Sequence, residues 1–211
     1  MHAIETTKKR MRCAQCARPQ SHCLCGLIPR IESRTRILLL QHPSEANHAL
    51  NTARLAALGL VNAELLIGEV FPKLPALISQ AEYQTCLLFP SDDAQPLVYT
   101  EDTLASQPLL IVVLDGTWRK ARKLLHVNPA LATLPRFVLP AGLQSRYRVR
   151  KTPAPGMVST LEAIVCALNV IEAPRNFDAL LTPFEALIDQ QITAMGPQTY
   201  MRNHGSINQP D

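Results

Sequence analysis

Asp115, Gly116, Thr117 and Trp118 stand together directly after a run of apolar residues, and their types suit chemistry on a charged or aromatic substrate. Asp115 offers a carboxylate that can accept or orient a proton. Trp118 is the only Trp of the chain and offers a flat surface on which a ring can stack. Four cations follow within residues 119–123. An acid, an aromatic ring and a basic segment in one place suit a reaction on a polyanion.

The same stretch also has a plainer interpretation. Residues 109–114 are six consecutive apolar residues, which predict a strand buried on both faces within a parallel sheet. Gly116 allows a sharp exit, and Asp115 or Thr117 can cap the helix expected to follow. Taken alone, the stretch favours such a helix cap. The functional interpretation gains weight because open α/β sheets bind ligands at the carboxyl ends of their strands, and because other features of the chain point the same way.

Charge is distributed unevenly along the chain, although the net charge is only +4. Residues 116–161 contain nine Lys or Arg and no Asp or Glu, and residues 8–36 contain eight basic residues and one acid. Residues 37–115 reverse the balance, with two basic and nine acidic residues. Two basic blocks that converge on one face favour a phosphate-backbone partner. We therefore expect nucleic-acid binding; the alternative is a generally basic surface.

The length of 211 residues and the apolar content of 47% predict one sizeable domain with an N-terminal appendage. We expect residues 1–30 to form the appendage and residues 31–211 the main domain. No apolar run is long enough to span a membrane, and the polar, basic start of the chain has no apolar signal core. We therefore expect a cytoplasmic protein without a membrane partner, whose cysteines are reduced or metal-bound.

Four of the six cysteines fall within thirteen residues, in the spacing C-x2-C-x6-C-x-C. Cys thiolates at such short separations can wrap a tetrahedral Zn²⁺, and four protein ligands leave no open position for catalysis. We expect structural zinc; His22 is an alternative ligand, and two disulfides or redox thiols are alternatives to a metal. The expected ligands are Cys13, Cys16, Cys23 and Cys25.

Strand and helix patterns alternate along the rest of the chain and predict an α/β fold with a largely parallel sheet flanked by helices. The chain contains no P-loop and no G-x-G-x-x-G motif. The expected strands are residues 36–41, 63–70, 85–89, 109–114 and 136–139. The expected helices are residues 51–59, 72–80, 118–127, 159–170 and 179–194. We expect a loop over residues 91–103 and a frayed end over residues 196–211.

Arg146, Arg148 and Arg150 alternate with Tyr147 and Val149, so an extended strand would place the three guanidinium groups on one side. Such a row suits phosphate oxygens or a substrate carboxylate, and the nearby ring could stack on a base. The alternative is a solvated edge strand whose charges deter aggregation. The full set of expected RNA-binding residues is His42, Arg54, Arg119, Arg122, Lys123, Arg146, Arg148 and Arg150.

Two further features lie at helix starts and strand ends. Ser159 or Thr160 is expected to cap the helix over residues 159–170, with Glu162 in its first turn, where the helix dipole favours an anion. A helix N-terminus after a Pro-Gly loop can also hold a charged group of a ligand. His42 and Glu45 occupy a strand-end loop and could act in acid-base chemistry, but a hydrogen-bonded loop histidine is the commoner outcome.

Four motifs in this order resemble those of the DTW-domain family, and the resemblance extends from Cys13 to about Ala194. They are the cysteine arrangement, residues 41–45 with 51–55, the Asp-Gly-Thr-Trp stretch, and residues 159–163. The resemblance implies a bacterial tRNA-uridine aminocarboxypropyltransferase. Such enzymes move the 3-amino-3-carboxypropyl group of S-adenosylmethionine to N3 of a uridine in the tRNA variable loop and release 5′-methylthioadenosine. It also implies a SPOUT-like fold with a C-terminal knot, in addition to the N-terminal zinc knuckle.

In the chemistry implied by the resemblance, Asp115 would accept or orient the uridine N3 proton and Trp118 would stack on the uracil or wall the cofactor pocket. The expected catalytic residues are Asp115, Thr117 and Trp118. Loops over residues 139–143 and 155–160 are expected to cradle S-adenosylmethionine. The expected cofactor-binding residues are Leu114, Gly116, Leu139, Pro140, Gly142, Leu143, Ser159, Thr160 and Glu162.

Two other functions compete with this one. A SPOUT-type RNA methyltransferase would use the same cofactor but transfer its methyl group. A zinc-containing RNA-binding module would bind no S-adenosylmethionine, and Asp115 would then serve only as a helix cap. We expect tRNA as the partner in the favoured case, and either a monomer or a homodimer.

Overall fold

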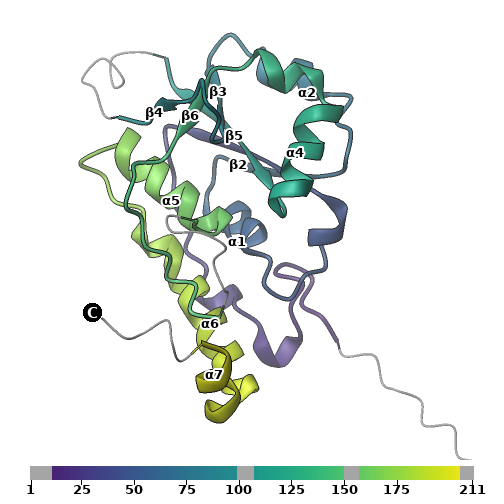
Figure 1. Cartoon of the computed structure of the whole chain (residues 1–211), viewed down its shortest axis with the longest axis vertical. Coiled ribbons are helices and arrows are strands. Elements are labelled where there is room, and N and C mark those ends of the chain that lie inside the picture. The colour runs from purple at the N-terminus through teal and green to yellow at the C-terminus, as the bar shows by residue number, and fades with distance from the viewer. Residues whose placement is uncertain (1–10, 99–106, 150–156, 205–211) are drawn as a thin grey trace, which may run out of the picture.

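The computed structural model describes residues 11–98, 107–149 and 157–204 (Figure 1). Within these residues, six strands form one sheet in the order β2-β1-β5-β3-β6-β4, and every pairing is parallel. The predicted parallel α/β architecture is therefore confirmed. The strands are β1 (Arg36–Gln41), β2 (Ala63–Ile67), β3 (Gln84–Leu88), β4 (Gln95–Pro96), β5 (Leu109–Asp115) and β6 (Arg136–Val138).

Helices cover both faces of this sheet (Figure 1). One face carries α1 (Thr52–Gly59), α5 (Thr160–Ile171) and α6 (Thr182–Met195). The other face carries α2 (Leu74–Ile78) and α4 (Trp118–Val127), and α7 (Pro197–His204) follows α6. The single-turn 3₁₀ helices are η1 (Gln20–His22), η2 (Cys25–Leu27), η3 (Pro43–Glu45), η4 (Pro129–Thr133) and η5 (Asp178–Leu181).

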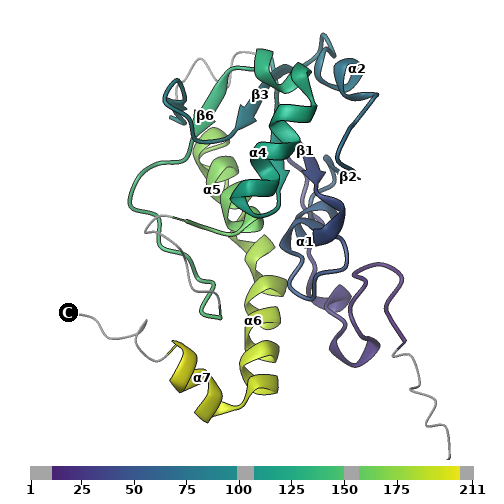
Figure 2. The same cartoon turned by 45° about the vertical axis from the view of Figure 1, so that its right-hand side comes forward.

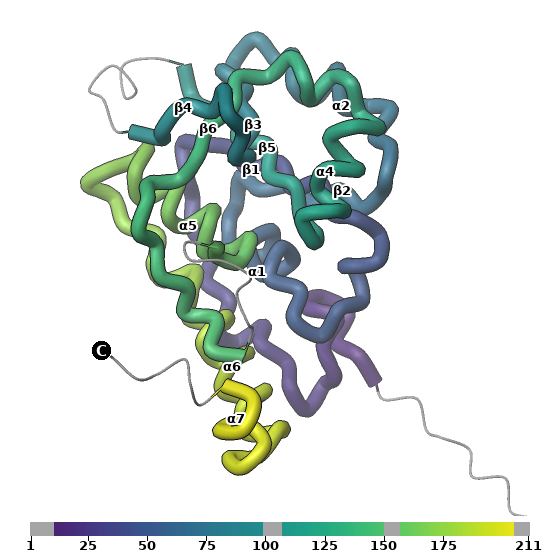
Figure 3. The backbone as a smooth tube through the Cα atoms, in the orientation of Figure 1, coloured from purple at the N-terminus to yellow at the C-terminus, as the bar shows by residue number. Residues whose placement is uncertain are grey.

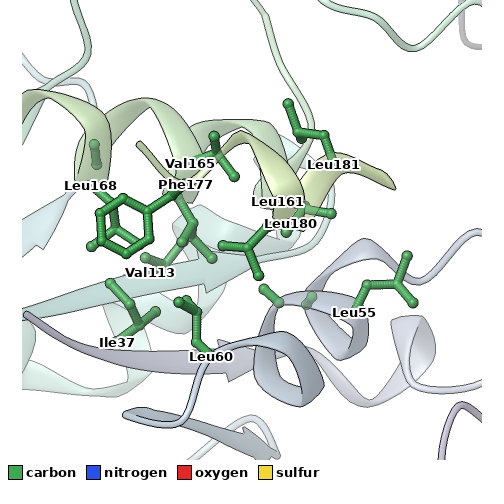
Figure 4. Packing of buried hydrophobic residues seen from close by; sticks show 14 of the residues in the cluster. Ile37, Leu55, Leu60, Val113, Leu161, Val165, Leu168, Phe177, Leu180 and Leu181 are labelled. Atoms are coloured by element: carbon green, nitrogen blue, oxygen red, sulfur yellow. The ribbon is translucent and has the colours of Figure 1, made fainter. Parts of the chain in front are cut away.

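The two layers of helices explain why the central strands are apolar throughout rather than alternating. Ile37 and Leu39 of β1 and Val113 of β5 pack against α1, α5 and the residues before α6 (Figure 4). Leu38 and Leu40 point the other way and pack with the residues of α2 and α4. Both sides of each central strand are buried, as expected for a parallel sheet between helices.

The described part of the segment over residues 1–30 docks on the main domain beside α1 and α6 (Figures 2 and 3). Leu24 is fully buried in the same cluster as β1 and α5. Arg18 donates hydrogen bonds to the carbonyl oxygen of Ala49 at 2.8 Å and to Oε1 of Gln190 at 2.8 Å. The division of the chain at residue 30 stays a prediction, but the two parts share one core.

The extended strand considered for Arg146, Arg148 and Arg150 is not formed where the structure describes these residues. Residues 144–149 are irregular and end in a turn, and residues 150–151 lie outside the described part. Tyr147 is buried, with its ring 5.2 Å from that of Phe184 in an edge-to-face contact. The alternation therefore arises because Tyr147 packs on α6 while Arg146 and Arg148 point to solvent. This arrangement does not require pairing with a neighbouring strand.

Other differences concern the ends of elements. Residues 197–204 form α7 instead of a frayed end, and the two-residue β4 lies inside the predicted loop over residues 91–103. The strand and helix predicted over residues 63–70 and 72–80 are shorter, as β2 and α2. The C-terminal knot stays a prediction, because residues 150–156 lie outside the described part. No helix among the described residues is long and apolar enough to cross a membrane.

The full burial of Leu39 in β1 allows a test of the described core. Replacing Leu39, which is fully buried, by Ala should lower the free energy of unfolding by about 2–5 kcal/mol, because the cavity left behind cannot fully collapse. Leu58→Ala is the matched control: its side chain is 36% exposed and belongs to neither core cluster, so its cost should be clearly smaller than that of Leu39→Ala. Urea unfolding of the zinc-loaded proteins measures both, and equal costs would contradict the described core.

Candidate active site and metal centre

The motifs of the sequence meet at the carboxyl edge of the sheet. Gln41 at the end of β1 and Asp115 at the end of β5 are direct partners in the parallel register. The Gln41 side-chain amide donates a hydrogen bond of 2.8 Å to Oδ2 of Asp115, and it also lies 3.0 Å from Oδ1 of Asn51. The Thr160 hydroxyl donates to Oδ1 of Asp115 at 2.5 Å. Three segments far apart in the chain are therefore joined by the Asp115 carboxylate.

Asp115 is a buried acid, with only 8% of its surface exposed. Both of its carboxylate oxygens accept a hydrogen bond from a neutral donor, so the side chain is held in one orientation. Sequence analysis assigned Asp115 to the site but not Gln41 or Asn51, although both lie in the motif over residues 41–45 and 51–55 that resembles the DTW-domain family.

A cavity of about 640 Å³, which we call the strand-end cavity, is lined by the two chain neighbours of Asp115, Leu114 and Gly116, and by its partner Thr160, while Asp115 itself lies behind this lining. Its volume lies in the range of about 300–1,000 Å³ that small-molecule sites occupy. It is formed by the ends of β3, β5 and β6, the loop after β6, and the start of α5. The predicted cofactor-binding residues that line it are Leu114, Gly116, Leu139, Pro140, Gly142, Leu143, Ser159 and Thr160.

The ninth predicted cofactor residue, Glu162, lies buried behind the cavity wall and shapes it. Its carboxylate accepts hydrogen bonds from the Ser159 backbone N–H at 2.7 Å and the Arg146 backbone N–H at 2.6 Å. The Ser145 hydroxyl donates to it as well, at 3.0 Å. Ser159 and Glu162 form a complete capping box, which confirms the predicted cap. One buried carboxylate thus ties the loop after β6 to the start of α5.

Gly116 is required by the close approach of α4 to the strand end. Its φ is +156°, and a Cβ at this position would lie 3.0 Å from Cβ of Lys120 and 3.6 Å from Cβ of His42. Any larger residue would push the start of α4 away. Thr117 holds the predicted N-cap position of α4, but its exposed side chain makes no capping hydrogen bond.

Trp118 forms part of the wall of the strand-end cavity. Its ring packs edge to face on Phe89 with 5.9 Å between centroids, and its Nε1–H lies 3.4 Å from Sδ of Met157. The side chain is nevertheless 39% exposed. An aromatic ring that is anchored on one side and open on the other can present its surface to a planar ligand.

His42 is a buried, hydrogen-bonded loop histidine. Its Nε2 lies 2.9 Å from Oε1 of Glu69, and its Nδ1 accepts the backbone N–H of Ser44. Lys123, predicted to bind RNA, also contacts Glu69, at 2.6 Å, and its ammonium holds the pKa of that carboxyl below its usual value. The structure therefore places both residues in a charged cluster with Glu69.

Four of the other predicted RNA-binding residues are exposed, namely Arg119, Arg122, Arg146 and Arg148. Arg119 and Arg122 are exposed on α4. Arg146 contacts Glu185 at 2.7 Å and Arg148 contacts Asp189 at 2.6 Å, and both guanidinium groups remain about half exposed. Exposed pairs of this kind contribute only about 0–1 kcal/mol, so they can exchange partners readily. Arg54 lies on α1, and Arg150 falls outside the described residues.

The four cysteines of the N-terminal segment gather as a metal-type cluster, with all sulfur atoms within 4.8 Å of one another. Sγ of Cys13 lies 3.5 Å from Sγ of Cys25, and Sγ of Cys16 lies 3.8 Å from Sγ of Cys23. A tetrahedral zinc with Zn–S bonds of about 2.3 Å has sulfur atoms about 3.8 Å apart. Backbone N–H groups of Cys16 and Gln15 lower the pKa of the Cys13 thiol to about 6. The donor set therefore fits Zn²⁺.

These features define an α/β protein with a ligand cavity at the strand ends and an attached knuckle of four metal-type cysteines. The family profile of the DTW domain matches residues 10–192, so the chain belongs to the DTW-domain family. No solved structure matches the chain.

Named relatives come from animals and plants. The chain is 30% identical over 202 residues to tRNA-uridine aminocarboxypropyltransferase 2 of Macaca fascicularis, covering 90% of this chain and 66% of that protein. It is 32% identical over 201 residues to the Drosophila melanogaster protein of the same name, covering 90% and 78%. It is 28% identical over 203 residues to tRNA-uridine aminocarboxypropyltransferase A of Arabidopsis thaliana, covering 78% and 74%. The chain thus spans about two thirds of the length of the macaque relative.

The cysteine cluster predicts one zinc ion per chain. Native mass spectrometry of the purified protein should show one Zn²⁺, and Cys16→Ser should remove it, because three thiolates hold the ion more weakly than four. Cys166→Ser is the matched control, since Cys166 lies in α5, outside the cluster, and this variant should keep its zinc. A metal-free wild-type protein with two disulfides would overturn the assignment.

Glu162→Gln tests the link between the loop after β6 and α5. An amide has one acceptor oxygen in place of two and turns an N–H₂ group toward existing donors, so the variant should lose about 1–3 kcal/mol of unfolding free energy. Hydrogen exchange should also accelerate at Ser145 to Tyr147. Glu82→Gln, at an exposed acid, is the control and should leave both measurements unchanged. Equal protection in the two variants would mean that Glu162 does not hold the loop.

Proposed function

We propose that the protein is a tRNA-uridine aminocarboxypropyltransferase that uses S-adenosylmethionine and releases 5′-methylthioadenosine. The observation that carries this proposal is its membership of the DTW-domain family over residues 10–192, together with relatives that bear this name. The cavity at the strand ends supports it, because residues of the matching motifs converge there from separate parts of the chain.

The strand-end cavity is the proposed site for S-adenosylmethionine. Its apolar wall suits an adenine ring, and Ser159, Thr160 and the backbone of residues 139–143 offer polar groups that would hold the ligand. When bound, the ligand supplies a sulfonium centre that activates its aminocarboxypropyl carbon for transfer. Gly142 has φ of +81° with no heavy atom within 4 Å of an added Cβ, so the loop backbone has room beside it.

Asp115 is the proposed group that accepts or orients the proton of uridine N3. The hydrogen bonds from Gln41 and Thr160 fix its carboxylate, so that a proton at the edge of the cavity meets a group of set orientation. Trp118 would stack on the uracil or wall the cavity. Thr117 lies beside both and completes the proposed catalytic set.

The exposed cations of α4 and of residues 146–148 are proposed to contact the tRNA backbone. Arg119 and Arg122 lie one turn apart on the helix that starts at Trp118, so backbone contacts there would hold RNA near the cavity. We propose that the reaction takes place in the cytoplasm, where a reducing environment keeps clustered thiols free of disulfides and able to bind zinc.

One experiment separates this proposal from methyl transfer. The wild-type protein is mixed with S-adenosylmethionine and unmodified tRNA, and the small molecules are identified by mass spectrometry. We expect 5′-methylthioadenosine, formed only when tRNA is present. S-adenosylhomocysteine would identify a methyltransferase instead, and absence of both products with no cofactor binding would favour an RNA-binding module.

Asp115→Asn tests the role of the carboxylate. Asn can keep both hydrogen bonds if its amide faces the Thr160 hydroxyl, so the fold should remain. Formation of 5′-methylthioadenosine should fall by at least about 10²-fold, since the amide cannot take up the proton. Asp178→Asn, on η5 at the far end of α5, is the control and should retain full activity. Retained activity in Asp115→Asn would remove this assignment.

A further inference from the structure

A second, smaller cavity of about 270 Å³ lies between the cysteine cluster, the loop over residues 46–49, α1 and α6, and we call it the basic groove. Among the described residues that line it, none is Asp or Glu. The basic side chains of the lining are Arg12, Arg18, His22, His48 and Arg54. A concave surface with several cations and no acid favours an anionic ligand.

Arg18 builds the groove, and each of its three guanidinium nitrogens donates one hydrogen bond within the protein. Its Nε donates to the carbonyl oxygen of His22 at 2.9 Å, and its two terminal nitrogens donate to Ala49 and Gln190. Its positive charge also lies near the thiols of Cys16 and Cys23. Arg18 therefore fixes the walls and offsets the charge of the cysteine cluster.

Arg54 has N–H donors without a close acceptor among the described residues. Its Nε is buried and has no hydrogen-bond partner among the described residues, and one terminal nitrogen makes only a long contact of 3.5 Å with the carbonyl oxygen of Gln15. A buried guanidinium N–H without an acceptor is costly, and such groups in native proteins usually mark a missing ligand or water. No acid in the described part of the chain forms an ion pair with Arg54 or Arg12.

Two neighbours add to the case for an anion. Nδ1 of His48 accepts the backbone N–H of Leu50 at 3.2 Å, which leaves Nε2 as a donor in the neutral ring. The groove also contains Asn51 at the start of α1, where the helix dipole favours negative charge. The nearby acids do not neutralise the groove, because Glu45 pairs with Lys120 and Asp189 pairs with Arg148.

We propose that the basic groove binds a backbone phosphate of the tRNA, with Arg54 as its main ligand and Arg12 beside it. This inference rests on the proposed function for the identity of the RNA. Asn51 links the groove to the reaction site: it accepts the Arg54 backbone N–H and contacts Gln41, which donates to Asp115. A phosphate held at Arg54 therefore sets the position of the tRNA relative to the strand-end cavity.

Arg54→Gln and Arg12→Gln test the proposal by tRNA binding at several salt concentrations. Loss of one guanidinium–phosphate contact should weaken binding by Arg54→Gln about tenfold. The slope of log K against log salt should become shallower by about one. Lys73→Gln removes the same charge at the exposed start of α2, outside the groove, and should bind like the wild type. Zinc content and melting temperature of Arg54→Gln should match the wild type.

Unchanged tRNA affinity and salt slope in both Arg variants would overturn the proposal, as would a wild-type protein that does not bind tRNA. A calorimetric titration with inorganic phosphate is the second arm: micromolar binding of free phosphate would assign the groove to a small anion instead of RNA. If tRNA binding depends on Arg54 but no 5′-methylthioadenosine forms, the groove assignment stands and only the proposed chemistry fails.

Discussion

The parallel register of β1 with β5 is the constraint on which the site depends, because it sets Gln41 directly beside Asp115. Parallel strands end at the same edge of a sheet, so the loops that follow them meet there. The hydrogen bond between the two side chains then joins the turn after β1 to the turn after β5. A shift of one residue would turn one of these side chains to the opposite face of the sheet and separate the motifs.

The strand-end cavity depends on a second buried carboxylate, which acts on the backbone. Glu162 caps α5 and, at the same time, accepts hydrogen bonds from Ser145 and Arg146, so the loop after β6 closes over the cavity. Thr160, at the start of the same helix, reaches Asp115. The start of α5 therefore contributes Ser159 and Thr160 to the cavity wall and holds the buried Asp115 through Thr160. A shift of this helix end would move both the wall and the Asp115 carboxylate.

Ion pairs distinguish the cations that are already neutralised by an acid from those that can meet an anionic ligand. Lys120 and Lys123 are committed to Glu45 and Glu69, and they hold α4 against the turns after β1 and β2. In the described part of the chain no acid pairs with Arg54. Its backbone N–H donates to Asn51, the residue that contacts Gln41 of the Asp115 network. Charge counts along the chain cannot separate paired from unpaired cations, because folding decides which acid lies beside each cation.

The sequence by itself determined five of the six strands, the main helices, the cap of α5 and the cysteine cluster, because apolar runs, caps and short Cys spacings act locally. It also located Asp115, since a strand end before Asp-Gly is visible in the chain. Tertiary structure alone decided the partners of Asp115, the burial of His42, and the docking of Tyr147 on α6 in place of an extended strand. These contacts join residues many positions apart, and only the strand register and the packing of helices bring such residues together.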